Sequence, residues 1–400
     1  MIFATYWFGL FALIFFPIFW AVRLRWLRLG WLLLGCLVFH AHFAGAAGML
    51  PIIVLATTTY AAGLWRNRVA LHVAMLLPVL ALVFYKYTHF VALSIIALVN
   101  PEWGRQADQV AGALLPITPP LAVSFFVFEF VHYLYDVNKG APSIRNPAHF
   151  GAFTFFFPSL VAGPIKRYQP FLASLRAGLP AVTVDDVKLG LMRIALGLFK
   201  KVAIADNVSA GLSYWGPRYA SLSLLSRWEF LAAIGIRILF DFSGYSDIAI
   251  GLARIMGVTL PENFGWPYLA TSLTGFWHRW HISLSTWIRD YVYIPLGGSR
   301  SGLPRKMLSG FVALALCGLW HGPAWNFAVW GIYHGAGLVI SSNYAAVLGR
   351  PGQALAALFA RARLLGWALT LVFVLIGWLF FFYPMAEAVV MLKLLFIQKP

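Results

Sequence analysis

The chain has 400 residues, of which 61% are hydrophobic and 11% are charged, and its formal net charge is +17 at pH 7. Soluble globular proteins carry about 25% charged residues, so this chain has too few to cover a water-exposed surface, and we expect lipid to surround it. The basic residues form short clusters between apolar runs, at 23–28, 66–68, 166–167 and 200–201. Such clusters are typical of cytoplasmic loops facing anionic lipid and argue against a nucleic-acid partner.

Apolar runs of about 20 residues, the length that crosses a bilayer as a helix, recur along the chain. We predict an all-α polytopic membrane protein of about ten or eleven such helices, folded as a single domain over residues 1–400. Strand alternation is absent over most of the chain, which favours a helical bundle over a barrel. The clearest runs are 2–22, 29–50, 69–99, 110–135, 186–206, 228–252, 306–320, 322–341 and 364–383, and the shorter runs 51–65, 150–163 and 385–397 are expected to be re-entrant or tilted.

The first apolar run, Met1–Trp20, has neither a basic leading region nor a small-residue cleavage site, so we expect a retained first helix. The basic cluster after it predicts an outward N-terminus. Another helix is expected to begin at Asp185 and Asp186 with Thr183 as its cap. Cysteine carries little information, because both cysteines lie in apolar stretches without a disulfide or zinc spacing.

A segment from about 261 to 306 is too polar to span a membrane and too aromatic for a free loop. We predict helices there that lie in the interface or dip partly into the membrane. Within it, residues 275–300 read GFWHRWHISLSTWIRDYVYIPLGGSR. On one helix, His278, His281 and Ser285 would share a face.

Three interpretations of this helix stay open. One is an amphipathic surface helix anchored by tryptophans such as Trp280, which leaves two histidines on one polar strip unexplained. Metal binding by those histidines lacks further ligands at a recognisable spacing. The third is the floor of a site, with Arg279 and Arg289 available to phosphate groups, although Arg289 can equally pair with the adjacent Asp290.

Acidic side chains in apolar segments are costly and raise functional hypotheses by default. Asp241 and Asp247 lie in FDFSGYSDIAIG, where we slightly favour a structural role: Gly244 would break or tighten the helix, and the carboxylates would satisfy backbone groups or pair with arginine. Glu129 and His132, in SFFVFEFVHYLYD, could form a proton path, but a hydrogen-bonded bundle interior is favoured.

The stretch LWHGPAWNFAVWGIYHG, at 319–335, places two histidines in an apolar run. On an unbroken helix, His321 and His334 would lie about 220° apart around the axis and about 20 Å apart along it, so they cannot form a local dyad. Pro323 is expected to end one element and start the next. That leaves His321 at a helix junction beside a cavity, whereas His334 is expected to be a packed residue.

Taken together, FWHRWHISLSTWIRDYVYIPLGG and LCGLWHG resemble motifs of the membrane-bound O-acyltransferase (MBOAT) family. More narrowly, SFFVFEFVHYLYD, FPSLVAGPIKRYQPF, GLFKKVAIADN and FDFSGYSDIAIGLARIMGVTLPENF resemble its bacterial branch, which includes the membrane subunit of alginate O-acetylation and the D-alanyl transfer protein of teichoic acid synthesis. The likeness runs from about residue 120 to 340. It implies a ring of tilted helices around a thin centre, with a cytoplasmic funnel leading to a histidine.

By position, the near-invariant histidine of the family corresponds to His321, and a second histidine of its RWH motif corresponds to His281. The resemblance implies an acyltransferase without a permanently bound cofactor or metal, which takes an acyl group, expected to be acetyl, from a cytoplasmic thioester such as acetyl-CoA. His321 would accept the hydroxyl proton. His281 or Asn326 would stabilise the oxyanion, and Trp320 would line the substrate channel.

The expected acceptor is an exopolysaccharide hydroxyl, with a periplasmic or membrane-anchored partner taking the acyl group onward from the bacterial inner membrane. D-alanyl transfer to teichoic acid is the alternative within the family. A solute transporter or channel is the alternative from another class, because buried acids and broken helices also suit a solute path. A non-catalytic scaffold would leave His321 replaceable.

Overall fold

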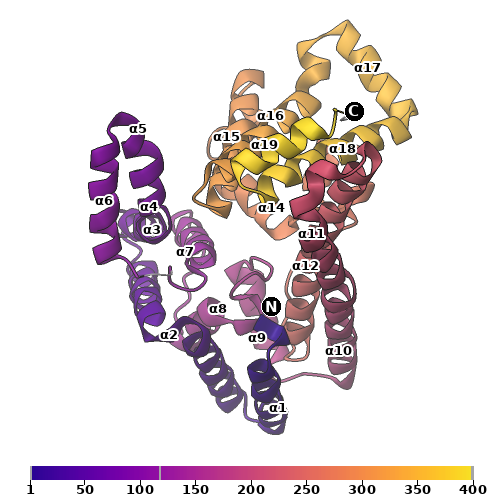
Figure 1. Cartoon of the computed structure of the whole chain (residues 1–400). Helices are drawn as coiled ribbons and strands as arrows, with labels where there is room; N and C mark the ends of the chain where they lie inside the picture. Colours follow the sequence, from indigo (N-terminus) through magenta and orange to yellow (C-terminus); the bar gives the residue numbers. More distant parts are fainter. Residues whose placement is uncertain (1, 117–118, 398–400) are drawn as a thin grey trace. The chain divides into compact units, whose positions relative to one another are not determined.

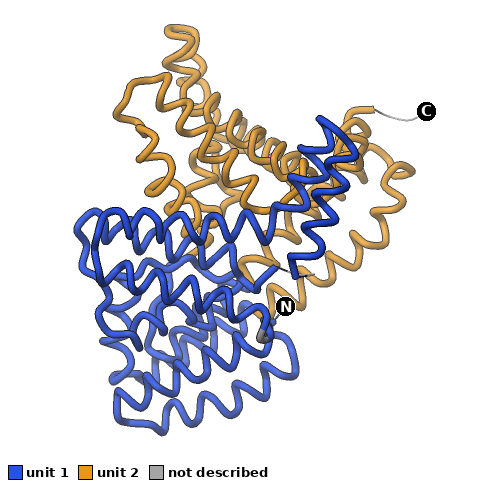
Figure 2. Tube along the Cα trace, turned by 90° about the vertical axis from the view of Figure 1, so that its left-hand side faces the viewer, with its two compact units in different colours: residues 1–197, 245–261 blue, residues 198–244, 262–400 orange. Residues whose placement is uncertain are grey.

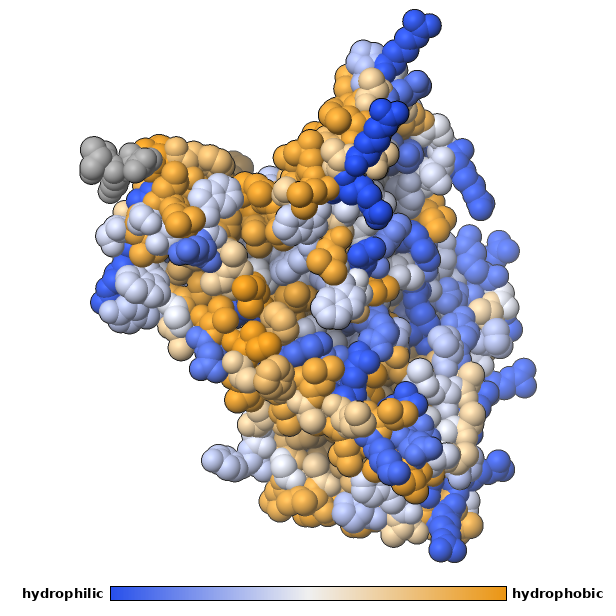
Figure 3. All heavy atoms as spheres, turned by 90° about the vertical axis from the view of Figure 1, so that its right-hand side faces the viewer, coloured by the Kyte–Doolittle hydropathy of each residue, from blue (hydrophilic) through white to orange (hydrophobic). Residues whose placement is uncertain are grey.

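The structure is a computed structural model that describes residues 2–116 and 119–397 (Figure 1). Within these residues the regular structure is helical, and the one strand-like pairing is an isolated antiparallel bridge between Phe264 and Trp280. The predicted all-α class is therefore confirmed. Hydrophobic side chains cover large parts of the face drawn in Figure 3, and hydrophilic ones gather along one side of it, as expected for a chain that meets both lipid and water.

The chain folds as two compact units, coloured separately in Figure 2. Unit 1 comprises residues 1–197 and 245–261, and unit 2 comprises 198–244 and 262–400. The helices of unit 1 are α1 (Tyr6–Ala21), α2 (Arg25–Trp65), α3 (Arg68–Leu82), α4 (Thr88–Val91), α5 (Ala97–Val99), α6 (Pro101–Leu114), α7 (Val123–Asn138), α8 (Pro147–Phe155), α9 (Tyr168–Gly178) and nearly all of α10 (Val184–Leu198).

Unit 2 begins with a π-helical stretch, Phe199–Asp206, that continues into α11 (Asn207–Trp215). Helix α12 (Leu224–Arg254) contributes its first part to unit 2 and its last part to unit 1. The remaining helices of unit 2 are α13 (Leu273–Trp277), α14 (Ile282–Ile288), α15 (Leu303–His321), α16 (Trp325–Val347), α17 (Arg350–Arg361), α18 (Arg363–Phe382) and α19 (Met385–Leu394).

Four segments of the described chain are long and apolar enough to cross a membrane: Arg25–Gly45, Ala47–Trp65, Arg68–Val99 and Arg363–Phe382. The first two are the halves of α2, which kinks where Gly45 adopts a φ of 65°, a value that glycine reaches without steric cost. The protein is thus a multi-pass membrane protein. The larger number of crossings expected from the sequence stays a prediction.

One expectation about a continuous helix is wrong, and one of the two alternatives given for Gly244 does not hold. The run 110–135 is not one helix, because α6 ends at Leu114 and α7 begins only at Val123. Prolines at 116, 119 and 120 separate the two helices, since proline removes a backbone donor and clashes with the preceding turn. Conversely, Gly244 does not break its helix: α12 continues to Arg254.

The predicted cap of α10 is confirmed. The hydroxyl of Thr183 accepts a hydrogen bond from the backbone N–H of Asp186 at 3.1 Å, and it donates to the Asp186 carboxylate at 2.7 Å. This reciprocal pairing satisfies one of the free N–H groups at the start of the helix. The hydrogen bonds from Thr183 also lower the pKa of Asp186 below its usual value, because they favour the charged carboxylate.

Candidate functional site

His321 is the last residue of α15, and the chain turns through Gly322 and Pro323 before α16 begins at Trp325. The prediction that His321 lies at a helix junction is confirmed. The two helices cross at very short range: a Cβ on Gly318 would lie 2.4 Å from the carbonyl oxygen of Phe327. Only glycine fits this crossing, which holds the end of α15 against the start of α16.

Aromatic rings surround the half-buried imidazole of His321. The ring centroids of Trp320, Phe381 and Trp330 lie 4.8, 5.0 and 5.2 Å from that of His321, and all three rings meet it edge to face. This setting restricts water around the ring without burying it completely. A partly desolvated imidazole of this kind can exchange a proton with a substrate that enters the site.

His281 lies in the turn between α13 and α14, and its side chain is buried, with 3% of the residue exposed. Its backbone adopts φ 43° and ψ 55°, a left-handed conformation uncommon outside glycine. A neighbouring strand-like segment holds the turn: the N–H of Ile282 donates to the carbonyl of Asn263 at 2.9 Å, and that of Gly265 donates to Arg279, also at 2.9 Å. Strained backbone at a buried histidine points to a functional constraint.

The turn also corrects one expectation. A single helix over 275–300 is wrong, because the helical structure stops at Trp277 and resumes at Ile282. His278 and His281 therefore do not share a helix face. His278 is exposed, whereas His281 points into the protein.

The imidazole of His281 packs edge to face against Phe242, at 4.6 Å between centroids, and its Nδ1 has no hydrogen-bond partner among the described residues. Burial lowers the pKa of His281 well below its usual range, and charge on His321 lowers that pKa further. A chain of ring contacts joins the two motifs, although they are forty positions apart in the chain. Trp280, next to His281, packs against Trp378, and Trp378 packs against Phe381, whose ring contacts His321. His281 is neutral at neutral pH and can serve as a donor or acceptor without carrying charge.

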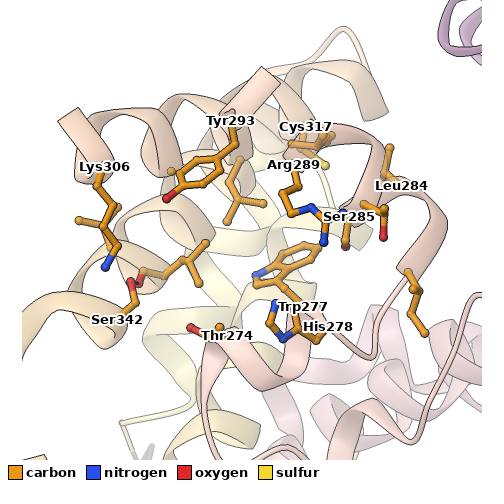
Figure 4. Close-up of a pocket in the computed structure, with 18 of the residues that line it drawn as sticks. Thr274, Trp277, His278, Leu284, Ser285, Arg289, Tyr293, Lys306, Cys317 and Ser342 are labelled. Atoms are coloured by element: carbon orange, nitrogen blue, oxygen red, sulfur yellow. Dashed lines mark hydrogen bonds between the residues drawn. The ribbon is translucent and has the colours of Figure 1, made fainter. Parts of the chain in front are cut away.

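A cavity of about 620 Å³ opens beside this pair (Figure 4). Neither histidine lines it, but Ile282, next to His281, and Cys317, one helical turn before His321, both do. The α13–α16 cavity, as we name it, is lined by Thr274, Trp277, His278, Ile282, Leu284, Ser285, Thr286, Ile288, Arg289, Tyr293, Lys306, Gly310, Ala313, Leu314, Cys317, Leu338, Val339, Ser342 and Asn343.

The cavity is basic. Figure 4 shows Arg289 reaching inward above Trp277 and His278, with Lys306 on the opposite side. The guanidinium Nε of Arg289 also donates to the carboxylate of Asp290 at 2.8 Å, so the predicted local ion pair is present. Arginine and lysine side chains placed this way suit phosphate groups.

The other sequence-predicted residues of unit 2 have structural partners. The amide of Asn326 donates to the carbonyl of Phe380 at 3.0 Å, and the carboxylate of Asp241 pairs with Lys201 at 2.7 Å. The hydroxyl of Ser285 donates to the carbonyl of Trp280 at 3.1 Å. Trp280 is buried among aromatic rings, including Trp378 at 4.8 Å between centroids, and the side chain of Arg279 is exposed.

The sequence-predicted residues of unit 1 have the structural role that we favoured for them, as paired groups in the interior of the helix bundle. Glu129 forms a buried ion pair with Lys166, and Asp247 pairs with Arg193 at 2.6 Å. His132 accepts a hydrogen bond from the backbone N–H of Tyr168 at 3.3 Å. Each acid therefore has a basic partner, as expected for a hydrogen-bonded bundle interior.

Sequence reasoning missed several residues that shape the site. Trp330 lies between the two histidines of the 319–335 stretch, with its ring 5.2 Å from His321 and 4.8 Å from His334. Phe242 and Asn263 support His281 from another part of the chain. Trp330 could have been found from its place in that stretch, but only tertiary structure brings Phe242 and Asn263 to the turn.

Known proteins match this chain over most of its length. Residues 121–386 match the model of the membrane-bound O-acyltransferase family. The chain is 36% identical over 299 residues to "Probable alginate O-acetylase AlgI" of Pseudomonas putida, which covers 74% of this chain and 58% of that protein. It is 31% identical over 341 residues to "Peptidoglycan O-acetyltransferase" of Helicobacter pylori, covering 79% of this chain and 62% of that protein.

A third relative shares less of the sequence. "Teichoic acid D-alanyltransferase" of Bacillus subtilis is 29% identical over 223 residues, covering 54% of this chain and 56% of that protein. The chain thus spans a little over half the length of the curated relatives that it matches. The matched family residues include both histidines of the site.

Proposed function

This chain belongs to the membrane-bound O-acyltransferase family, and from that membership we propose that it is an acyltransferase, which moves an acetyl group from a thioester to a hydroxyl for O-acetylation of a carbohydrate polymer. The observation that carries the proposal is that one cluster of aromatic rings connects the motifs of His321 and His281, next to a basic cavity. Relatives named for acetylation of alginate and of peptidoglycan support a carbohydrate acceptor.

In the proposed reaction, His321 acts as general base. Its imidazole takes the proton of the acceptor hydroxyl while the oxygen attacks the thioester carbonyl. The tetrahedral intermediate then expels the thiolate, which receives the proton from His321, so that the products are an ester and a free thiol. An acyl-histidine intermediate would require an additional step.

The oxyanion of the tetrahedral intermediate needs a donor close to the reacting carbonyl. We assign this role to neutral His281, because its buried Nδ1 is without a hydrogen-bond partner in the described residues. The amide of Asn326 already donates to the carbonyl of Phe380. That contact makes Asn326 a weaker candidate for the same role.

We assign the α13–α16 cavity to the thioester donor. Arg289 and Lys306 supply positive charge for the phosphates of a donor such as acetyl-CoA, and His278 lines the cavity beside them. The apolar wall formed by Leu314, Cys317 and their neighbours suits the pantetheine arm. In this assignment the cavity faces the cytoplasm, and the chain lies in the bacterial inner membrane with its N-terminus outward. A periplasmic or membrane-anchored partner would carry the acetyl group to the polymer.

The test is an O-acetyl assay in the native host. Cells producing His321→Ala at unchanged membrane levels are compared with wild type for O-acetyl on exopolysaccharide and peptidoglycan, D-alanine on teichoic acid, and polymer export. We expect loss of O-acetyl with normal export. Full acetylation would overturn the proposal, loss of export would favour the transporter, and loss of D-alanine alone would favour the D-alanyltransferase.

A further inference from the structure

A second cavity, of about 750 Å³, lies in unit 2 between α11, the 3-10 turn Gly216–Ser221, α12 and the α18–α19 corner. It shares no lining residue with the α13–α16 cavity. Two charged side chains line it, Arg237 and Glu387. Nothing in the acyl-transfer reaction proposed above uses either of them. We name it the Arg237 cavity.

Arg237 is held in a fixed orientation. Its Nε donates to the hydroxyl of Ser209 at 2.9 Å, and its guanidinium carbon lies 4.4 Å from the centroid of the Phe382 ring. These contacts use one edge and one face of the guanidinium. Within the described residues, Arg237 has no acidic partner at ion-pair distance. A half-buried arginine in that state is available to an anion, because its remaining N–H groups are donors in a planar fork.

Glu387 lines the same cavity from α19, and its carboxylate also forms no ion pair within the described residues. Tyr383 lines the same cavity. Burial raises the pKa of Tyr383 to about 12, with Glu387 raising and Arg237 lowering that pKa. A cation and an anion therefore line one cavity without neutralising each other. This arrangement matches a ligand that carries both signs of charge a short distance apart.

Most other lining residues of the cavity are apolar, and the cavity adjoins a candidate membrane span. Phe382 is the last residue of α18, one of the four segments able to cross a membrane. Leu212, Met391 and Leu394 form part of the wall, and Val390 is 54% exposed. Such a wall suits hydrocarbon chains beside a polar headgroup.

We propose that the Arg237 cavity binds a phospholipid with a zwitterionic phosphate–ammonium headgroup, of the phosphatidylethanolamine type. The phosphate accepts hydrogen bonds from Arg237, the ammonium donates to Glu387, and an acyl chain lies along Leu212, Met391 and Leu394. Charge complementarity selects this headgroup over an anionic one, because an anionic headgroup leaves Glu387 without a partner and next to a negative charge.

The test uses the full-length protein in nanodiscs of equal parts phosphatidylethanolamine and phosphatidylglycerol. The protein is released from the nanodiscs into the gas phase, and native mass spectrometry identifies the lipids that stay bound to it. We expect wild type to retain phosphatidylethanolamine preferentially. Arg237→Gln should reduce retention of both lipids about tenfold or more, as expected for loss of a charge-assisted hydrogen bond. Glu387→Gln should reduce retention of phosphatidylethanolamine alone.

Arg218→Gln is the matched control. The guanidinium of Arg218 also stacks on an aromatic ring, 4.4 Å from Tyr214, yet Arg218 does not line the cavity. It should leave lipid retention unchanged, and melting temperatures of all variants confirm that they fold. Equal retention by every variant would identify surface lipid only and overturn the proposal.

Two further outcomes would also contradict it. Preference for phosphatidylglycerol that Glu387→Gln leaves unchanged would assign the cavity to an anionic lipid. Displacement of the lipid by soluble glycerophosphoethanolamine at equal concentration would assign it to a free phosphate compound instead. We expect this soluble headgroup not to compete, because it lacks the chains that the apolar wall accepts.

Discussion

Two buried polar clusters of this protein look similar in the sequence but differ in the structure. In unit 1, Glu129 and Lys166 pair with each other, and His132 accepts a backbone N–H. In unit 2, His281 has a strained backbone, and its Nδ1 has no hydrogen-bond partner in the described part of the chain. Charge on His321 also lowers the pKa of His281. We assign a structural role to the cluster whose opposite charges pair with each other, and a role toward substrate to the histidine that a strained turn holds next to the α13–α16 cavity. We therefore expect substitutions in the two clusters to separate stability from activity.

We expect the largest change in the free energy of unfolding from breaking the buried ion pair between Lys166 and Glu129. Lys166→Met leaves the Glu129 carboxylate buried without its cation, and we expect a loss of about 3–5 kcal/mol in the free energy of unfolding. Combining Lys166→Met with Glu129→Gln should recover most of that loss, because no unpaired charge remains. Unfolding of the purified proteins in detergent measures the free energy of unfolding of the single and the double variant. If the double variant has normal stability but no acyl transfer, the ion pair is part of the chemistry and the comparison is wrong.

His281→Asn should show the opposite pattern. Asparagine tolerates the left-handed backbone, so the melting temperature should change little. Loss of one oxyanion donor should reduce kcat about 10²–10³-fold. The measurement is the rate of acetyl transfer per folded protein, and an unchanged rate would remove His281 from the site.

Gly318→Ala tests whether the close helix crossing positions His321. The new Cβ would meet the carbonyl of Phe327 at 2.4 Å, so we expect a loss of about 1–3 kcal/mol and a lower rate of acyl transfer. Gly211→Ala, in α11, is the control, because nothing lies within 4 Å of its new Cβ and it lines neither cavity. Equal behaviour of the two variants would show that the crossing is not tight.

The smallest expected effect is on pH dependence. Because burial depresses the pKa of His281 in the folded state, the unfolded chain binds more protons near pH 6 than the folded protein does. The neutral-His281 contribution to stability is then complete above the unfolded pKa of about 6.5 and decreases as pH falls below it. His281→Asn should flatten the dependence of melting temperature on pH below about 6.5, whereas the same slope in both proteins would contradict a buried neutral His281.

The sequence predicts the fold class, the helix junction at His321 and the cap at Thr183, because these depend on local signals: apolar length, proline and side-chain capping. It does not predict the turn at His278–His281, where a continuous helical pattern is overridden by pairing with Asn263 and Gly265. The partners of Asp247 and Asp241 likewise come from distant helices. Such partners depend on tertiary packing, which leaves no periodic trace in the chain. The proximity of His281 to His321 was expected from family resemblance and not from spacing.

The most direct measurement of the central claim compares the two histidines of the 319–335 stretch. Acetyl transfer to polymer is measured for His321→Ala and His334→Leu, each normalised to folded protein in the membrane. His334 is buried among the rings of Trp330, Trp277 and Phe373. Because leucine can replace this packing, His334→Leu should retain a rate within a few-fold of wild type. His321→Ala should lower the rate about 10²–10⁴-fold. A His321→Ala protein as active as His334→Leu would contradict the account.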